Sequence, residues 1–164
     1  NATLNRLSAS FVSSDVWDGV QGRFDFVAAN LPALPISLTP NLAFAAAGES
    51  DPTALTRRFF ERLDEYLEPD GECRMLTFAP VDGQGDRLLR EAGERLGRMS
   101  MEYCVRDEMG LASPVFRRLR HVLICVVKDG RGLRRVRTAP WWQRVSLPLV
   151  APGAPVQGLT VARC

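Results

Sequence analysis

The sequence is poor in the residues from which metal centres and nucleophilic sites are usually built. Its 164 residues include a single histidine, His121, at the start of an apolar segment, where a histidine is more often structural. A zinc site or a Ser-His or Cys-His pair could involve no other histidine. The four cysteines, Cys73, Cys104, Cys125 and Cys164, are widely spaced, with no Cys-x-x-Cys, and three of them fall in predicted strands. This pattern is typical of reduced core cysteines rather than of a disulfide framework.

The chain also lacks a long hydrophobic run. The longest apolar stretches, around residues 42–47 and 121–127, are much shorter than a membrane-spanning helix. The first residues show no basic and then apolar signal pattern. Because 46% of the residues are hydrophobic, the chain can bury a core, and we expect one main α/β domain in a soluble, cytoplasmic protein.

The most informative segment is residues 24–32, FDFVAANLP, an apolar strand followed at once by an Asn-x-Pro turn. An unbroken apolar strand predicts burial on both faces, as in a parallel sheet, and such sheets bind ligands at the carboxyl ends of their strands. Asn30 offers a carbonyl acceptor and an NH2 donor, while Pro32 removes a backbone donor. The Asn30 Oδ1 and the Leu31 carbonyl could therefore hold an NH2 group with its lone pair facing an electrophile. The alternative is a plain turn that closes a buried strand.

The surrounding segments predict alternating strands and helices. Residues 10–17 read as a short strand that ends near an acid, and Asp51-Pro52 suits the start of a helix. Apolar residues at i, i+4 spacing give that helix its core-facing stripe: Leu55, Phe59, Leu63 and Leu67. We then expect a turn at residues 69–71, a strand at 73–79, a helix at 88–96, and strands at 99–106 and 120–128.

This ordered set resembles the C-terminal half of a class I S-adenosylmethionine-dependent methyltransferase. The resemblance is closest to the N5-glutamine and N6-adenine branch, whose Asn-Pro-Pro-Tyr motif corresponds to Asn30-Leu31-Pro32-Ala33 in this chain. It covers residues 1–128 and implies a partial Rossmann-like fold: a mixed sheet with flanking helices whose first two strands are absent. Residues 129–164 are predicted to form an extended Arg/Pro-rich tail with short strands at 145–150 and 159–161.

The resemblance also implies roles for individual residues. Asp15 would accept a hydrogen bond from the adenine amino group of S-adenosylmethionine, and the Val16 backbone N–H would contact the ring. Asn30 and the Leu31 carbonyl would hold the acceptor amino group beside the cofactor, and Pro32 would stiffen the turn. Holding two reactants in attack geometry can supply about 7–11 kcal/mol of a barrier, so positioning would be most of the catalysis.

Position 33 departs from the family, because Ala33 stands where the motif has an aromatic residue. Stacking on an aromatic ring is worth about 1–3 kcal/mol per base, so a nucleobase is less favoured as a substrate than an amide. Trp17 or Phe44 could replace the ring, although each also suits a role in the core.

The family's first two strands, its Gly-x-Gly loop and its ribose-binding acid would precede residue 1. Gly83-Gln84-Gly85 follows a late strand, so it reads as an ordinary loop into a helix. Without the two strands, the strand around Phe11 would have no neighbour and the strand at Phe24 would have a bare edge. We therefore expect a second chain to fill the gap, as in a homo-oligomer, or the N-terminal segment to rearrange, and we expect this chain alone to be inactive.

Charge is distributed unevenly along the chain. Residues 1–114 contain 11 arginines and 18 acidic residues, a net charge of −7, whereas residues 115–144 contain nine basic residues and one aspartate, a net charge of +8. With Trp141 and Trp142 nearby, the basic segment could bind nucleic acid, or it could pair with the acidic part of the protein. Two functions stay open: a methyltransferase acting on a nitrogen of a protein, nucleic acid or small molecule, and an inactive methyltransferase-like module that binds RNA or a partner protein through the basic segment.

Overall fold

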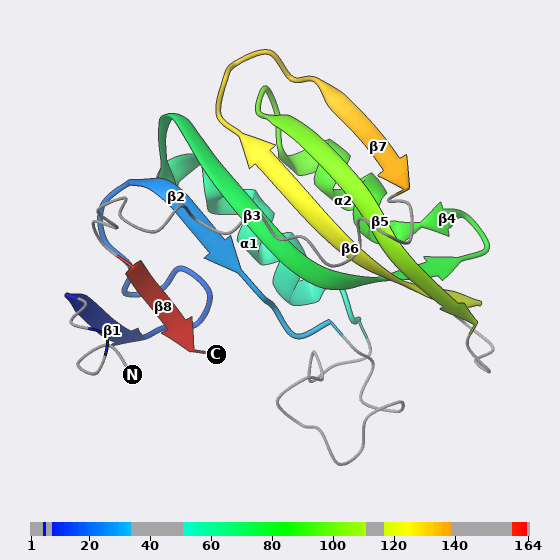
Figure 1. Ribbon diagram of the computed structural model, residues 1–164, viewed down its shortest axis with the longest axis horizontal. Coiled ribbons are helices and arrows are strands. Elements are labelled where there is room, and N and C mark those ends of the chain that lie inside the picture. The colour runs from blue at the N-terminus through cyan, green and yellow to red at the C-terminus, as the bar shows by residue number, and fades with distance from the viewer. Residues whose placement is uncertain (1–4, 6–7, 34–50, 111–116, 139–158, 164) are drawn as a thin grey trace. The chain divides into compact units, whose positions relative to one another are not determined.

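The computed structural model describes residue 5 and residues 8–33, 51–110, 117–138 and 159–163 (Figure 1). The chain divides into two compact units, one formed by Asn1–Gln21 with Val145–Cys164 and the other by Gly22–Arg144. Neither described helix is long and apolar enough to cross a membrane.

The first unit contains a two-stranded parallel sheet. Strand β1 (Ala9–Ser13) pairs with β8 (Leu159–Arg163), so that the N-terminal strand lies beside a strand from the other end of the chain. The expectation that β1 has no neighbour is therefore wrong, because β8 provides one. Strand β8 contains the strand predicted at residues 159–161, whereas the one predicted at 145–150 lies outside the described residues.

The second unit is a six-stranded mixed sheet in the order β2-β3-β6-β5-β7, with β4 beside β3 (Figure 1). The strands are β2 (Phe24–Ala29), β3 (Leu67–Asp82), β4 (Gly85–Asp86), β5 (Ser100–Gly110), β6 (Arg118–Val127) and β7 (Arg134–Thr138). Strand β6 lies between β3 and β5 and is antiparallel to both, whereas β2 is parallel to β3 and β7 to β5. The predicted fold class, an α/β mixed sheet with flanking helices, is confirmed.

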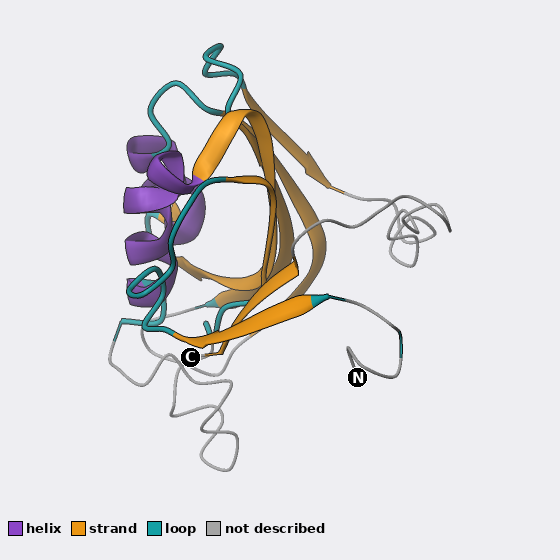
Figure 2. Ribbon diagram, turned by 90° about the vertical axis from the view of Figure 1, so that its left-hand side faces the viewer, coloured by secondary structure: helices purple, strands orange, loops and turns teal. Residues whose placement is uncertain are grey.

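Helices α1 (Ala54–Tyr66) and α2 (Arg87–Arg95) cover one face of this sheet (Figure 2). The α1 residues Phe59, Phe60 and Leu63 are buried, as are Leu88 and Ala92 of α2. The predicted stripe of α1 is therefore correct at its centre but not at its first position, since Leu55 is only half-buried.

Alternate residues of the central strands face the helices and complete the core. In β3 these residues are Cys73, Met75, Thr77, Ala79 and Val81, and all five are buried. The same alternation continues in β5 and β6 with Met101, Tyr103, Val105, Val122, Ile124 and Val126. The core therefore lies between the two helices and one face of the sheet.

Strand β2 differs from its prediction. It forms the edge of the sheet, and Phe26, Asp25 and Ala28 are exposed, with 49% of the Phe26 surface accessible. The expectation of burial on both faces is wrong, because side chains on both faces of β2 are exposed and no helix of the described residues covers Phe26. The expectation that this strand has a bare edge in the sheet is confirmed for the described residues.

Two further segments form β-strand where the sequence predicted a turn or an extended tail. Helix α1 continues directly into β3 through Leu67, and the turn expected at residues 69–71 is an irregularity within this strand, where Asp70 has φ 61°. Part of the predicted tail, β7, pairs with β5 from Met101↔Arg134 to Val105↔Thr138.

Candidate active site

The Asn-x-Pro turn lies where the pairing of β2 with β3 stops. The last paired residues are Ala29 and Met75, and Asn30 follows with an exposed side chain. Among the described residues, the Asn30 side chain makes no hydrogen bond, so its amide is available to a ligand. Leu31 and Pro32 are half-buried, and Ala33 is buried with 2% exposure. The turn thus presents one free amide at the carboxyl end of a parallel strand, where α/β sheets bind ligands.

The Leu31 carbonyl oxygen accepts a hydrogen bond from the Thr77 hydroxyl on β3, with a distance of 3.5 Å between the two oxygens. Thr77 is 2% exposed. Thr77 was not among the predicted site residues, because a threonine in an apolar strand also suits a purely structural role. What sets it apart is its place in β3, where it is the polar residue of the helix-facing row.

The two residues expected at the adenine lie in a turn of the first unit that follows β1. Asp15 is exposed, its carbonyl accepts from the Asp18 N–H, and the Ser14 hydroxyl donates to the Val16 carbonyl. Val16 is buried and has φ 59°, a conformation that is rare for a β-branched residue. Trp17 is also buried, at 6% exposure, which agrees with a core role for this side chain, whereas Phe44 lies outside the described residues. Asp15 and Val16 thus belong to one unit and Asn30 to the other.

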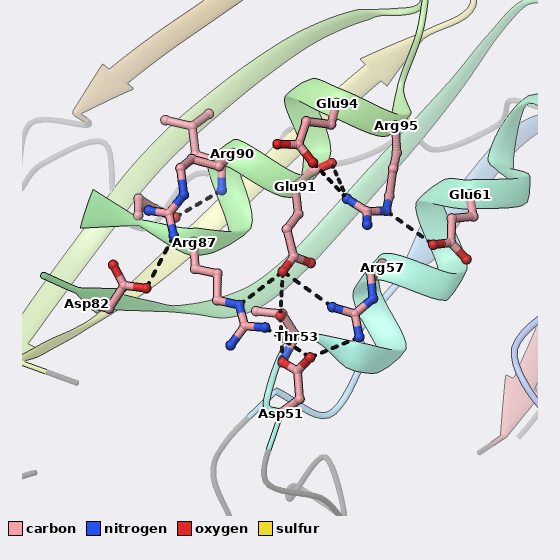
Figure 3. A network of polar contacts seen from close by, with 12 residues as sticks. Asp51, Thr53, Arg57, Glu61, Asp82, Arg87, Arg90, Glu91, Glu94 and Arg95 are labelled. Carbon is pink, nitrogen blue, oxygen red and sulfur yellow. Dashed lines mark hydrogen bonds and ion pairs between the residues drawn. The ribbon is translucent and has the colours of Figure 1, made fainter. Parts of the chain in front are cut away.

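A network of ion pairs joins the start of α1 to α2 (Figure 3). Asp51 Oδ1 accepts from the Thr53 N–H and hydroxyl, and its Oδ2 accepts from Arg57 at 2.9 Å and Arg87 at 3.1 Å. Glu91 Oε1 accepts from the same two arginines and from the Thr53 hydroxyl. Asp51 therefore does organise the start of α1 as predicted, although the N-cap position is Thr53.

The pKa of Asp51 shows how these contacts balance. Burial raises the pKa of this carboxyl, but the hydrogen bonds from Thr53 and Arg57 and the charge of Arg87 outweigh burial, and its pKa lies below the usual value. With two carboxylates and two guanidinium groups at its centre, the network is neutral. We assign it the role of fixing the two helices together.

The single histidine and the cysteines have structural surroundings. The His121 ring stacks on Phe78, with 5.0 Å between the ring centroids, and burial, together with the charge of Arg106, lowers its pKa. Cys73 is buried and Cys104 and Cys125 are half-buried, and all three are free thiols, as expected. In the described part of the chain, no group of histidine, cysteine or acidic residues could hold a metal ion.

Most described basic side chains of the segment 115–144 are paired with acids. Arg118 and Arg120 both contact Glu108, and Arg120 also contacts Asp86 at 3.1 Å. The other ion pairs are Lys128–Asp64, Arg131–Asp129 and Arg137–Glu102. Apart from Arg131–Asp129, which lies within the basic segment itself, these pairs join the basic segment to the acidic part of the same chain, as in the second of the two interpretations of its charge asymmetry.

Comparison with known proteins shows that the chain is similar to methyltransferases. No protein-family profile matches the chain. Over 80 residues the chain is 36% identical to a protein of Methanocaldococcus jannaschii named "Putative protein N5-glutamine methyltransferase"; the match covers 46% of this chain and 41% of that protein. The chain thus spans about two fifths of the length of this curated relative.

Solved structures with a similar arrangement include a methyltransferase from Pyrococcus furiosus, with a TM-score of 0.45 and 18% identity over 79% of this chain and 54% of that chain. Another is M1.HpyAVI, with a TM-score of 0.37 and 10% identity over 81% of this chain and 68% of that chain. The expected resemblance to the N5-glutamine methyltransferase branch is confirmed by the sequence match: the chain resembles part of a protein named "Putative protein N5-glutamine methyltransferase".

Proposed function

We propose that the protein is an S-adenosylmethionine-dependent methyltransferase that acts on a nitrogen, and that this chain contributes the side that holds the methyl acceptor. The observation that carries the proposal is the turn after β2, where the exposed Asn30 and then Leu31 directly follow the last paired residue of a parallel strand. The sequence match to a protein named as an N5-glutamine methyltransferase supports the same reaction.

The residues present fit one part of the cofactor. The exposed Asp15 carboxylate can accept from an adenine amino group, and the Val16 backbone N–H can donate to a ring nitrogen. We assign these two residues, which belong to the first unit, to the adenine, and Asn30, which belongs to the second unit, to the methyl acceptor. When bound, the cofactor would supply an electrophilic methyl group for transfer to the acceptor nitrogen, with the S–CH3 electron pair remaining on sulfur and a proton leaving the nitrogen for water.

Asn30 and Leu31 would act by orientation. The Asn30 Oδ1 and the Leu31 carbonyl each accept one N–H of the acceptor NH2 group, which leaves the nitrogen lone pair free for the methyl carbon. Pro32 has no N–H to compete for these acceptors, and its fixed φ limits movement of the turn. No general base is needed, because the proton leaves only after the nitrogen has gained the methyl group.

We propose a glutamine side-chain amide of a protein as the acceptor. The reason within the chain is Ala33, which is buried and offers no ring on which a base could stack. An amide needs no such ring, since two hydrogen bonds to its NH2 group fix its plane. The name of the archaeal relative points to the same group.

The substitution Asn30→Ala tests the proposal in the full-length protein. We expect methyl transfer to a peptide with one central glutamine to fall by about 100-fold or more, because misplacement of a reactant by about 1 Å has a cost of that order. Calorimetric titration should show nearly unchanged affinity for S-adenosylmethionine. Asp25→Ala, which removes an exposed side chain from the same strand, is the matched control and should keep the activity.

Calorimetry of the wild type with S-adenosylmethionine and S-adenosylhomocysteine separates the enzyme from its rival, a methyltransferase-like binding module. Binding of either compound by the protein supports the enzyme. If the protein binds neither compound, the enzyme proposal is wrong and the binding module is left. The rival gains no support from the described basic side chains, most of which are occupied by acids.

A further inference from the structure

We infer that Thr77 is a positioning residue of the proposed reaction, and that its hydroxyl sets the direction of the Leu31 carbonyl that holds the acceptor nitrogen. This inference rests on the proposed function and adds to it a residue on a different strand from the Asn-x-Pro motif. It is carried by three features of Thr77: its burial, its place in the register, and the partner of its hydroxyl.

Thr77 is buried among apolar neighbours. The residues on either side of it in the helix-facing row, Met75 and Ala79, are both fully buried, and Thr77 itself is 2% exposed. A hydroxyl in such a place is costly unless it has a hydrogen-bond partner. Among the described residues, the partner of the Thr77 hydroxyl is the Leu31 carbonyl.

The register explains why a side chain is needed at this point. The parallel pairing of β2 with β3 ends at Ala29↔Met75, and Thr77 lies two residues further along β3, while Leu31 lies two residues beyond the end of β2. Pro32 cannot donate to a continued ladder, because it has no N–H. The Thr77 hydroxyl therefore takes the place of the backbone bonds that would otherwise hold Leu31, just where the chain leaves the sheet.

The contact with Thr77 leaves the Leu31 carbonyl oxygen able to accept a second hydrogen bond. A carbonyl oxygen has two lone pairs, so one can accept from Thr77 and the other from an acceptor N–H. The distance of 3.5 Å is long for a bond from a hydroxyl. Long contacts of this kind often tighten when the substrate binds. Because this contact is long before binding, we expect its effect on orientation to be modest in size.

Three variants test the inference in the full-length protein. Thr77→Val keeps the shape and removes the hydroxyl, whereas Thr77→Ser keeps the hydroxyl. Thr56→Val is the matched control, since Thr56 is also a buried threonine but its hydroxyl has no partner among the described residues. The assay uses S-adenosylmethionine with the peptide that carries one central glutamine.

For Thr77→Val we expect kcat/KM for the peptide to fall by roughly threefold to tenfold, the effect of losing one ordinary hydrogen bond in the transition state. The calorimetric affinity for S-adenosylmethionine should stay unchanged. Thr77→Ser should restore the rate, and Thr56→Val should not alter it. Full activity of Thr77→Val, or failure of the serine variant to restore the rate, would overturn the inference and leave the proposed function intact.

A second readout does not depend on turnover. In carbon-detected NMR spectra of the labelled protein, the 13C carbonyl resonance of Leu31 should move in Thr77→Val and return towards its original position in Thr77→Ser. A resonance that does not move shows that the hydroxyl does not act on this carbonyl, and the inference is then wrong. If the wild type itself transfers no methyl group, the proposed function fails and the positioning role fails with it.

Discussion

Gly71 lies where β3 begins its regular pairing, and its missing side chain has a direct structural reason. A Cβ atom at this position would be 2.8 Å from the Glu68 carbonyl oxygen and 3.0 Å from that of Phe24. Both are backbone atoms, so neither can turn away. Gly71 therefore lets the edge strand β2 come close to β3 beside the irregular segment that follows α1.

The prediction at the residue scale is that Gly71→Ala destabilises the protein by about 1–3 kcal/mol, the usual range for an added atom in a packed site. Urea unfolding at neutral pH measures the change. Gly83→Ala is the control, because a Cβ at Gly83 would meet no atom within 4 Å. Equal stability of the two variants would mean that β2 is not held close to Gly71.

Asn30 could be proposed from the sequence and Thr77 could not, because of how far apart along the chain the residues involved lie. An Asn-x-Pro turn after an apolar strand is visible in a linear sequence, because all its parts are adjacent. The contact between Thr77 and Leu31 joins positions 46 residues apart, and only the pairing of β2 with β3 brings them together. Threonine is also common in strands, so the residue alone gave no signal.

Among the elements, the pair α1 and α2 owes its fixed arrangement to the network around Asp51 and Glu91 (Figure 3). One pair in it, Arg87 and Glu91, has i,i+4 spacing and can be read from the sequence. The contacts of Asp51 with Arg87 and of Glu91 with Arg57 depend on the packing of the two helices. The helices themselves could be predicted, but the network that joins them could not.

The prediction at the scale of the elements concerns how the contribution of Asp51 to folding stability changes at acid pH. Its pKa in the folded protein is lowered below 3.8, so its contribution to stability is present above that value and is lost as the pH falls through the lower, folded-state pKa. Asp51→Asn should cost about 1–2 kcal/mol at pH 7, the loss of hydrogen bonds that involve charged groups. Its deficit should shrink when urea unfolding is repeated near pH 3.

Other carboxyls with lowered pKa values, Asp82 and Glu108, keep their own acid dependence in this variant. The stability of Asp51→Asn should therefore still fall with acid, but less steeply than that of the wild type. Asp25→Asn serves as the exposed control. A constant deficit from pH 7 to pH 3 would show that the charge of Asp51 is not what joins the helices.

How well each strand could be predicted from the sequence depended on how deeply it is buried. The segments that became β5 and β6 alternate between buried and half-buried residues, and their strands were predicted to within a few residues at most ends. Strand β7 was missed because its sequence, RRVRT, is charged and exposed, as an edge strand can be. Strand β2 was predicted as a strand but with the wrong surroundings, since an apolar run does not reveal whether a second strand covers it.

At the scale of the whole molecule, the two units should respond separately to a truncation. Removal of residues 145–164 takes away β8, the partner of β1, while the six-stranded sheet keeps all of its strands. Hydrogen exchange followed by mass spectrometry should show loss of protection at Ala9–Ser13 and unchanged protection in β3, β5 and β6. Loss of protection throughout would mean that the second unit depends on the first for its stability.

The position of β6 in the sheet has a consequence for synthesis on the ribosome. The strands β3 and β5 leave the ribosome before β6, yet β6 lies between them and pairs with both. Until residue 127 has emerged, each of them therefore has an edge of unpaired amides and carbonyls beside an incomplete core. Nascent chains with such edges are prone to aggregate and are typical substrates of chaperones. In the sheet that carries the Asn30 turn, β6 can thus pair along its full length with β3 and β5 only after about three quarters of this sequence has emerged from the ribosome.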